Sequence, residues 1–119
     1  MCIRDRKEHT CLHPFDFTGL EETLEQLKGR PVYFTVDLDV MDPSVFPGTG
    51  TPEPGGVTFD QLRRAVTMVC ERAYIAGCDV NELSPHYDLS GASTAAACKI
   101  VREMVLALQR QDQEKHKLT

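Results

Sequence analysis

Two aspartates separated by one residue, Asp37 and Asp39, end an apolar run in this 119-residue chain. If the run is an extended strand, its side chains alternate between two sides, so both carboxylates point the same way with Cα atoms roughly 7 Å apart. Bare carboxylates this close repel each other and resist desolvation, so a cation is expected to compensate them. The pair is therefore a candidate half of a metal site, and solvated aspartates at a frayed strand end are the simpler alternative.

The elements around this pair are predicted from periodicity and capping signals. Capping boxes at Thr18/Glu21 and Thr58/Gln61 indicate helix starts, and apolar residues at helical spacing follow each of them. The expected helices cover residues 18–28, 58–73 and 93–110, and the expected strands cover 32–39 and 74–83. The polar residues after 110 are expected to fray.

The order helix, strand, helix, strand, helix predicts an α/β fold: a three-layer parallel sheet flanked by helices, with its strands buried on both faces. Ligands of such sheets bind outside the carboxyl ends of the strands. Asp37 and Asp39 end the first strand and Glu82 ends the second. The sequence thus predicts that three acidic groups converge on one rim.

The connection over residues 42–56 is rich in proline and glycine and too long for a passive link, which is typical of a functional loop. Asp42, before Pro43, is expected to form a turn rather than bind a metal. Thr49 and Glu53 are weaker candidates to line a pocket. Positive φ angles or close backbone approach are the expected roles of Gly48, Gly50, Gly55 and Gly56.

Composition bounds the partners. A formal net charge of −5 with no dense stripe of lysine or arginine argues against nucleic acid or an anionic membrane surface as a partner. No apolar run has the length of a bilayer span, and the first residues lack the apolar core of a signal peptide, so a cytoplasmic location is expected. Five cysteines without C-x-x-C spacing predict reduced thiols, several of them buried, rather than disulfides or a zinc ribbon.

The string TVDLDVMDPSVFPGTGTPEPGG, residues 35–56, resembles the signature of the ureohydrolases, the arginase and agmatinase family: S-x-D-x-D-x-x-D-P followed by P-G-T-G-T-P-E-x-G-G. The similarity extends through DVNELSPHYDLSGASTAAACKIVREMV and covers roughly Phe15 to Leu108. Thr35 stands where the family usually has serine, which keeps the hydroxyl. The TPEPGG form looks more like agmatinases than arginases.

The resemblance implies an arginase-like fold and a site with two Mn²⁺ ions. It implies that Asp37 bridges both ions, that Asp39 binds one, and that Glu82 pairs with the substrate guanidinium. The implied reaction is metal-assisted hydrolysis of a small guanidino compound, with agmatine giving putrescine and urea as the leading candidate. Full-length family members are expected to form homo-oligomers.

The family pattern also has a histidine ligand, a D-A-H-x-D segment and a catalytic histidine upstream, and this sequence contains none of them. The chain is therefore expected to be a C-terminal fragment that supplies no catalytic histidine and is inactive alone. Residues 1–12 are predicted to be a loose or non-native lead-in, 13–110 the C-terminal part of a ureohydrolase domain, and 111–119 a polar tail.

Two alternatives stay open at this point. A D-x-D at a strand end also begins haloacid-dehalogenase-like phosphatases, in which Asp37 would be the nucleophile and Mg²⁺ would assist. Those proteins normally have Gly and Thr after the second Asp, whereas Val40 and Met41 follow here. The other alternative is a non-catalytic ureohydrolase paralogue that keeps the fold and serves as an assembly partner.

Overall fold

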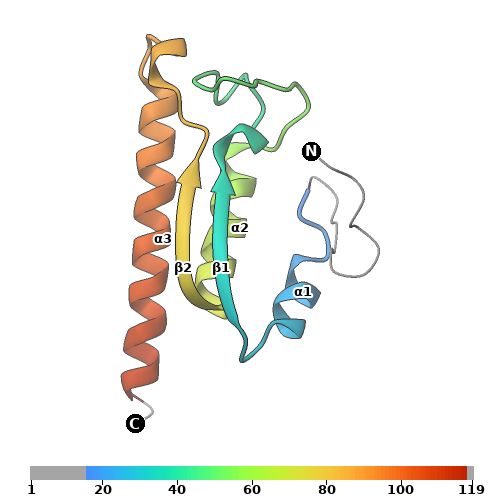
Figure 1. Cartoon of the computed structure of the whole chain (residues 1–119), viewed down its shortest axis with the longest axis vertical. Helices are drawn as coiled ribbons and strands as arrows, with labels where there is room; N and C mark the ends of the chain where they lie inside the picture. The colour runs from blue at the N-terminus through green and yellow to red at the C-terminus, as the bar shows by residue number, and fades with distance from the viewer. Residues whose placement is uncertain (1–15, 118–119) are drawn as a thin grey trace.

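The computed structural model describes residues 16–117, with side chains described through residue 113. Its elements are α1 (Leu20–Gln26), β1 (Pro31–Asp37), the 3-10 helix η2 (Leu38–Val40), α2 (Phe59–Arg72), β2 (Tyr74–Asn81), the 3-10 helix η3 (Pro85–Tyr87) and α3 (Ala92–Lys117). The predicted order of helices and strands is confirmed (Figure 1). The expected lead-in, residues 1–12, lies outside the described residues.

The two strands are parallel, and their register runs from Pro31 beside Tyr74 to Asp37 beside Asn81. Since α2 connects them, both strands end at the same edge of the sheet, and Figure 1 shows the loops after β1 and β2 emerging together there. The expected α/β architecture with a parallel sheet is confirmed. This topology places the residues after both strands at one rim.

All three helices lie against one face of the sheet. The main core joins α2, α3, the end of β1 and the following loop, and consists of Val36, Leu38, Met41, Phe46, Val57, Leu62, Val66, Cys70, Ala97, Ile100, Met104 and Ala107. The opposite face is uncovered within residues 16–117, with Tyr33 67% exposed. The prediction that the strands are buried on both faces is therefore not fulfilled within residues 16–117. Helices cover only one face there, and no second helical layer lies among these residues.

The two predicted capping boxes have different outcomes. At α2 the prediction is confirmed: the Thr58 hydroxyl accepts from the Gln61 amide at 3.2 Å, and the Gln61 side chain accepts from the Thr58 amide at 2.8 Å. At α1 it is wrong, because Gly19, with φ 86°, is the N-cap and no side chain caps the helix. The Thr18 amide instead donates to Asp16, in a turn that precedes the helix.

The last helix is longer than expected. α3 continues to Lys117, past the predicted end near residue 110. Its last residues include glutamine, glutamate and lysine, which are good helix formers, and none is glycine or proline, so polar composition alone does not end the helix. No helix among residues 16–117 is both long and apolar enough to cross a lipid bilayer.

Asp42 closes the loop over residues 42–56, as predicted for a turn former. Its Oδ1 accepts from the Ser44 amide and hydroxyl, and its Oδ2 accepts from the Gly55 amide at 2.8 Å. These bonds lower the pKa of Asp42 below its ordinary value. One side chain therefore ties the start of the loop to its end.

Gly56 is required by close backbone approach. A Cβ built there would lie 2.5 Å from both the Asp42 nitrogen and the Val40 oxygen, which are backbone atoms that cannot move aside. We expect Gly56→Ala to lower the free energy of unfolding by about 1–3 kcal/mol, measured by urea denaturation. Gly50→Ala is the matched control, because a Cβ at Gly50 meets nothing within 4 Å. Equal effects of the two substitutions would contradict this account.

Candidate functional site

Asp37 and Asp39 both lie at the carboxyl end of β1, but not on one extended strand. The strand ends at Asp37, and Leu38–Val40 forms a 3-10 turn. The prediction that strand alternation carries both side chains to one side is therefore wrong at Asp39. The physical reason is that pairing with β2 ends at Asp37, and the Met41 amide then donates to the Leu38 carbonyl at 3.1 Å, which closes a 3-10 turn.

Both aspartates nevertheless border the same cavity. It has a volume of about 420 Å³ and lies between β1, α1 and α2. Apart from the two aspartates and Thr35, its lining is apolar: Phe17, Leu20, Phe34, Val36, Val40, Leu62, Ala65, Val66 and Val69. Asp37 is exposed and Asp39 is half-buried. Two carboxylates thus stand at the wall of an otherwise apolar cleft.

Glu82 directly follows β2, at the edge where β1 ends. Its side chain is exposed, and its backbone has φ 70°, in the left-handed region that non-glycine residues rarely adopt. Such strained residues cluster at functional sites. The structure thus places the three predicted site residues at one edge, but among the side chains of residues 16–113 no three His, Cys, Asp or Glu are grouped closely enough to hold a metal ion.

The loop over residues 42–56 reaches back to Asp39. The Thr51 hydroxyl donates to Asp39 Oδ2 at 2.8 Å, a contact that sequence reasoning missed. Of the two weaker candidates in this loop, Thr49 is buried and Glu53 is exposed. Thr51 thus orients one carboxylate oxygen of Asp39 and leaves the other available to a ligand.

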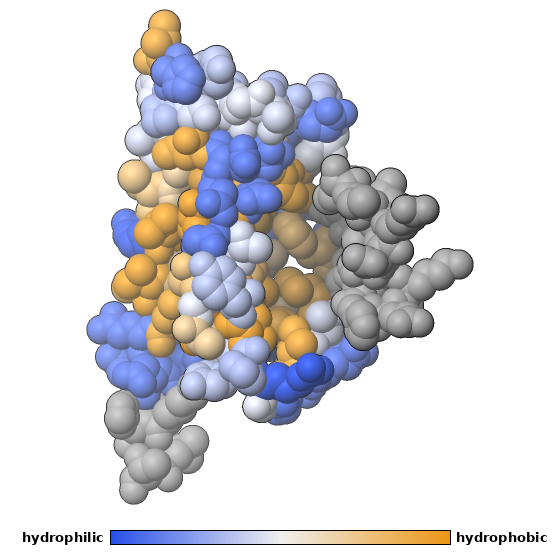
Figure 2. Space-filling model, in the orientation of Figure 1, coloured by the Kyte–Doolittle hydropathy of each residue, from blue (hydrophilic) through white to orange (hydrophobic). Residues whose placement is uncertain are grey.

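A chain of hydrogen bonds crosses the open face of the sheet below Asp37. Asp79 accepts from the hydroxyls of Tyr33 at 2.7 Å and Thr35 at 2.6 Å, and Asn81 donates to Thr35 at 3.1 Å. The hydrogen bonds from Thr35 and Tyr33 lower the pKa of Asp79, and the hydrogen bond to Asp79, together with its charge, raises the pKa of Tyr33. Figure 2 shows a hydrophilic band between apolar surfaces on this face. The sequence offered one signal for this cluster: Asp79 and Asn81 are two positions apart on β2, so strand alternation puts their side chains on the same face.

Asp88 is a buried carboxylate in the loop before α3. Its oxygens accept from the amides and hydroxyls of Ser90 and Ser93 at 2.6–3.1 Å. These four hydrogen bonds favour the ionised form of Asp88 and lower its pKa to about 2. The hydrogen bond from the Ser90 hydroxyl has the largest effect.

Acid should remove the stabilisation that Asp88 provides. Because its pKa is lowered from 3.8 to about 2, this contribution is complete above about pH 4 and is lost as the pH falls toward 2. We expect Asp88→Asn to be less stable than the unmodified chain at neutral pH, with a difference that narrows between pH 4 and pH 2. Urea denaturation across this range measures it, and a pH-independent difference would contradict the assignment.

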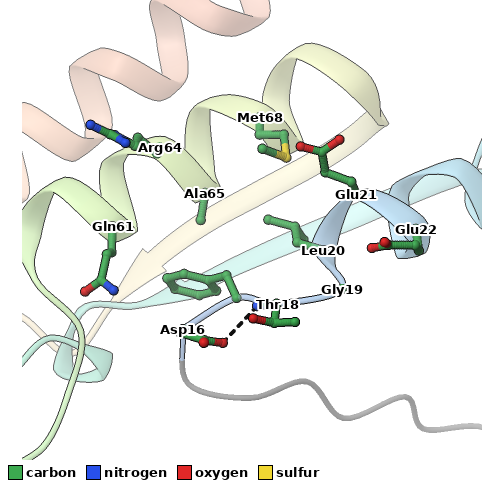
Figure 3. Close-up of a pocket in the computed structure, with 11 residues that line it drawn as sticks. Asp16, Thr18, Gly19, Leu20, Glu21, Glu22, Gln61, Arg64, Ala65 and Met68 are labelled. Carbon is green, nitrogen blue, oxygen red and sulfur yellow. Dashed lines mark hydrogen bonds between the residues drawn. The ribbon is translucent and has the colours of Figure 1, made fainter.

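A second cavity of about 420 Å³ lies between α1 and α2 (Figure 3). Leu20, Ala65 and Met68 form its apolar floor, while Glu21, Glu22 and Arg64 stand around it. Glu21 is paired with Arg72 at 3.1 Å. Its lining includes no residue of β1 or β2, so it lies away from the carboxyl edge of the sheet, where ligands of parallel α/β sheets bind. The first cavity is therefore the better candidate site.

Four other reactive side chains fall within residues 16–113: those of Cys70, Cys78, Cys98 and His86. Burial raises the pKa of the Cys70 thiol to about 11, so it is protonated at neutral pH and packs as an apolar group. Cys78 and Cys98 are exposed free thiols. His86 is exposed with its ring against Tyr87, and His9 and His13 lie outside the described residues.

Comparison with known proteins agrees with the signature in the loop after β1. The chain is 44% identical over 97 residues to the agmatinase of Bacillus anthracis, covering 80% of this chain and 33% of the relative. It is 40% identical over 89 residues to the human mitochondrial guanidino acid hydrolase, covering 75% of this chain and 25% of that protein. The chain thus spans a third or less of the length of these curated relatives.

A solved structure gives the same result for the fold. The proclavaminate amidino hydrolase of Streptomyces clavuligerus superposes with a TM-score of 0.73 at 35% identity, over 81% of this chain and 32% of that one. The model of the arginase family matches residues 9–107, which include β1, β2 and every candidate site residue. The chain belongs to the arginase family.

Proposed function

We propose that this chain forms part of a manganese-dependent hydrolase of guanidino compounds, most closely of the agmatinase type. The observation that carries the proposal is the placement of Asp37 and Asp39 on one cavity at the carboxyl edge of the sheet. Family membership implies a site for two metal ions, and relatives with 44% identity are agmatinases. In the proposed reaction water adds to the guanidinium carbon and its bond to the chain nitrogen breaks, giving urea and an amine.

The two aspartates fit a hard divalent cation. Both present carboxylate oxygens, the donors that manganese and magnesium favour. Asp37 accepts no hydrogen bond from the other described residues, and Thr51 engages only one oxygen of Asp39. When bound, manganese would supply Lewis-acid activation of water near neutral pH. Asp37 and Asp39 would hold the ions, and Thr51 would keep the Asp39 carboxylate oriented toward them.

Glu82 is the proposed partner of the substrate. A guanidinium is planar and offers paired N–H donors, which suit a carboxylate that accepts two hydrogen bonds. Glu82 is exposed at the edge where β1 also ends, so its carboxylate can accept them. It would hold the guanidinium carbon near the metal ions, and such positioning lowers the barrier by removing the entropy cost of encounter.

The remaining ligands are proposed to come from polypeptide beyond this chain. β1 pairs only with β2 within residues 16–117, so its other edge has unpaired backbone groups. The apolar cavity and the open sheet face adjoin that edge. A further strand and its loop could therefore add to β1 and bring additional ligands beside Asp37. Cytoplasmic location and homo-oligomerisation of the whole enzyme are part of the same proposal.

The test compares the chain alone with a completed enzyme. The purified 119-residue chain is expected to release no urea from agmatine with added Mn²⁺, because two carboxylates leave most coordination positions of each ion unfilled. A chimera in which this chain replaces the matching third of the Bacillus anthracis agmatinase is expected to be active. Arginine and 4-guanidinobutyrate are the comparison substrates.

Each result decides between defined alternatives. Turnover by the chain alone would contradict its role as one part of a site. A folded but inactive chimera would favour the non-catalytic paralogue, and preference for 4-guanidinobutyrate would move the proposal from agmatine to guanidino acids. Membership of the arginase family already disagrees with the phosphatase alternative.

A further inference from the structure

Gly48 connects three segments that are far apart in the sequence. Its carbonyl accepts from the Ser84 amide at 2.7 Å, and its amide donates to the Ser93 hydroxyl at 2.8 Å. A Cβ at this position would lie 2.6 Å from the Ser93 Cβ, so only glycine brings the loop this close to α3. Gly48 thus joins the loop after β1 to the loop after β2 and to the first turn of α3.

Ser93 is held in turn by Asp88. The fully buried Ser93 hydroxyl donates to Asp88 Oδ2 at 2.6 Å while it accepts from Gly48, and the Ser93 amide donates to the same oxygen at 2.7 Å. The hydrogen bonds therefore run in one direction, from the Gly48 amide to the Ser93 hydroxyl and from that hydroxyl to the Asp88 carboxylate. We call this pair of hydrogen bonds the relay. A hydrogen bond that ends on a carboxylate is shorter and stronger than a neutral one.

The two ends of this connection lie next to candidate site residues. Three positions after Gly48, Thr51 donates to Asp39. Ser84, which Gly48 binds, comes two positions after the strained Glu82. Neither Asp88 nor Ser93 borders the cavity beside Asp37. A substitution at Ser93 can therefore affect both the Thr51–Asp39 contact and the loop that carries Glu82, although Ser93 does not line the cavity.

We propose that Asp88 and Ser93 are positioning residues that, through Gly48, hold the Thr51–Asp39 contact and the Glu82 loop in one fixed relation. The relay alone follows from the contacts, and its importance for catalysis rests on the proposed function of Asp39 and Glu82. It would act by keeping the metal-binding carboxylate and the guanidinium-binding carboxylate at a constant separation, which a near-attack geometry requires.

The first arm of the test is amide hydrogen exchange by NMR on the 119-residue chain. Ser93→Ala removes the hydroxyl and leaves the buried Gly48 amide without an acceptor, so protection of the Ser84 amide is expected to fall about tenfold. Ser90→Ala is the matched control, because its hydroxyl also donates to Asp88 but does not contact Gly48. Amides in the middle of α2 report global stability.

This comparison separates positioning from helix capping. A role confined to capping would lower protection in the first turn of α3 in both variants and leave Ser84 unchanged, and that result would overturn the proposal. If Ser93→Ala fails to fold, Asp88→Asn gives the same readout, with a smaller loss at Ser84 expected because an acceptor oxygen remains. Unchanged Ser84 protection in that variant would equally overturn the proposal.

The second arm is kinetic and uses the agmatinase chimera. Ser93→Ala is expected to lower kcat/KM for agmatine roughly tenfold, because the relay sets the geometry of both carboxylates, while Ser90→Ala has little effect. Equal losses in the two variants would overturn the positioning role. A chimera without activity would count against the proposed function, whereas the exchange arm would still decide whether the relay holds the two loops together.

Discussion

Asp37→Asn in the agmatinase chimera is expected to lower urea release from agmatine by more than about 100-fold. Loss of a residue that only supports a metal ligand typically costs about 10- to 100-fold. Asparagine keeps the shape of the side chain but removes the charge and one carboxylate oxygen. The larger loss follows because Asp37 would itself be a metal ligand in the proposed site. Urea release is measured over a range of Mn²⁺ concentrations.

The stability of the fold should be almost unaffected by this substitution. Asp37 is exposed, and none of the other described residues donates a hydrogen bond to its side chain. A change of no more than about 0.5 kcal/mol in the free energy of unfolding is therefore expected. The matched control is Glu71→Gln, which alters an exposed carboxylate at the end of α2, where it is paired with Arg110. An Asp37→Asn chimera that kept full activity would remove the basis of the proposed metal site.

Phe46→Ala is expected to have the largest effect on the fold, about 3–5 kcal/mol of the free energy of unfolding. Phe46 is fully buried and belongs to the main core, where it anchors the loop over residues 42–56 beneath the site. Since small domains are stable by only about 5–15 kcal/mol, this loss could unfold much of the population. Urea denaturation followed by circular dichroism measures it.

An exposed apolar residue provides the control for this substitution. Leu89 is 97% exposed, so Leu89→Ala should change stability by less than about 0.5 kcal/mol. Similar midpoints for Phe46→Ala and Leu89→Ala would show that the loop is not anchored in the core. A large loss for Phe46→Ala alone would support the packing that places Thr51 over Asp39.

Features that depend on local interactions were predictable from the sequence. The α2 capping box involves residues three apart, and the turn at Asp42 begins with its contact to Ser44, so both follow from neighbouring side chains. The parallel arrangement of the strands followed from the helix between them. That arrangement is what brought the positions of Asp37 and Glu82 to one edge.

The predictions that were wrong or incomplete concern the ends of elements, where turn hydrogen bonds compete with the expected pattern. Pairing with β2 ends at Asp37 and the next residues form a 3-10 turn, so Asp39 leaves the strand pattern that its spacing indicated. Gly19 rather than Thr18 caps α1, since the preceding turn takes up the Thr18 amide. In each case a turn hydrogen bond between near neighbours, from Met41 to Leu38 or from Thr18 to Asp16, decided the local backbone.

By itself, the sequence determined the order of the elements, the edge of the sheet on which the acidic residues lie, and the family signature in the loop after β1. Only the tertiary structure decided how those acids are held: the Thr51 hydroxyl on Asp39, the open face below Asp37, and the relay from Gly48 through Ser93 to Asp88. The physical reason is distance along the chain. Gly48 and Ser93 are 45 positions apart, and their contact exists only because the packing of α3 on the core brings them together.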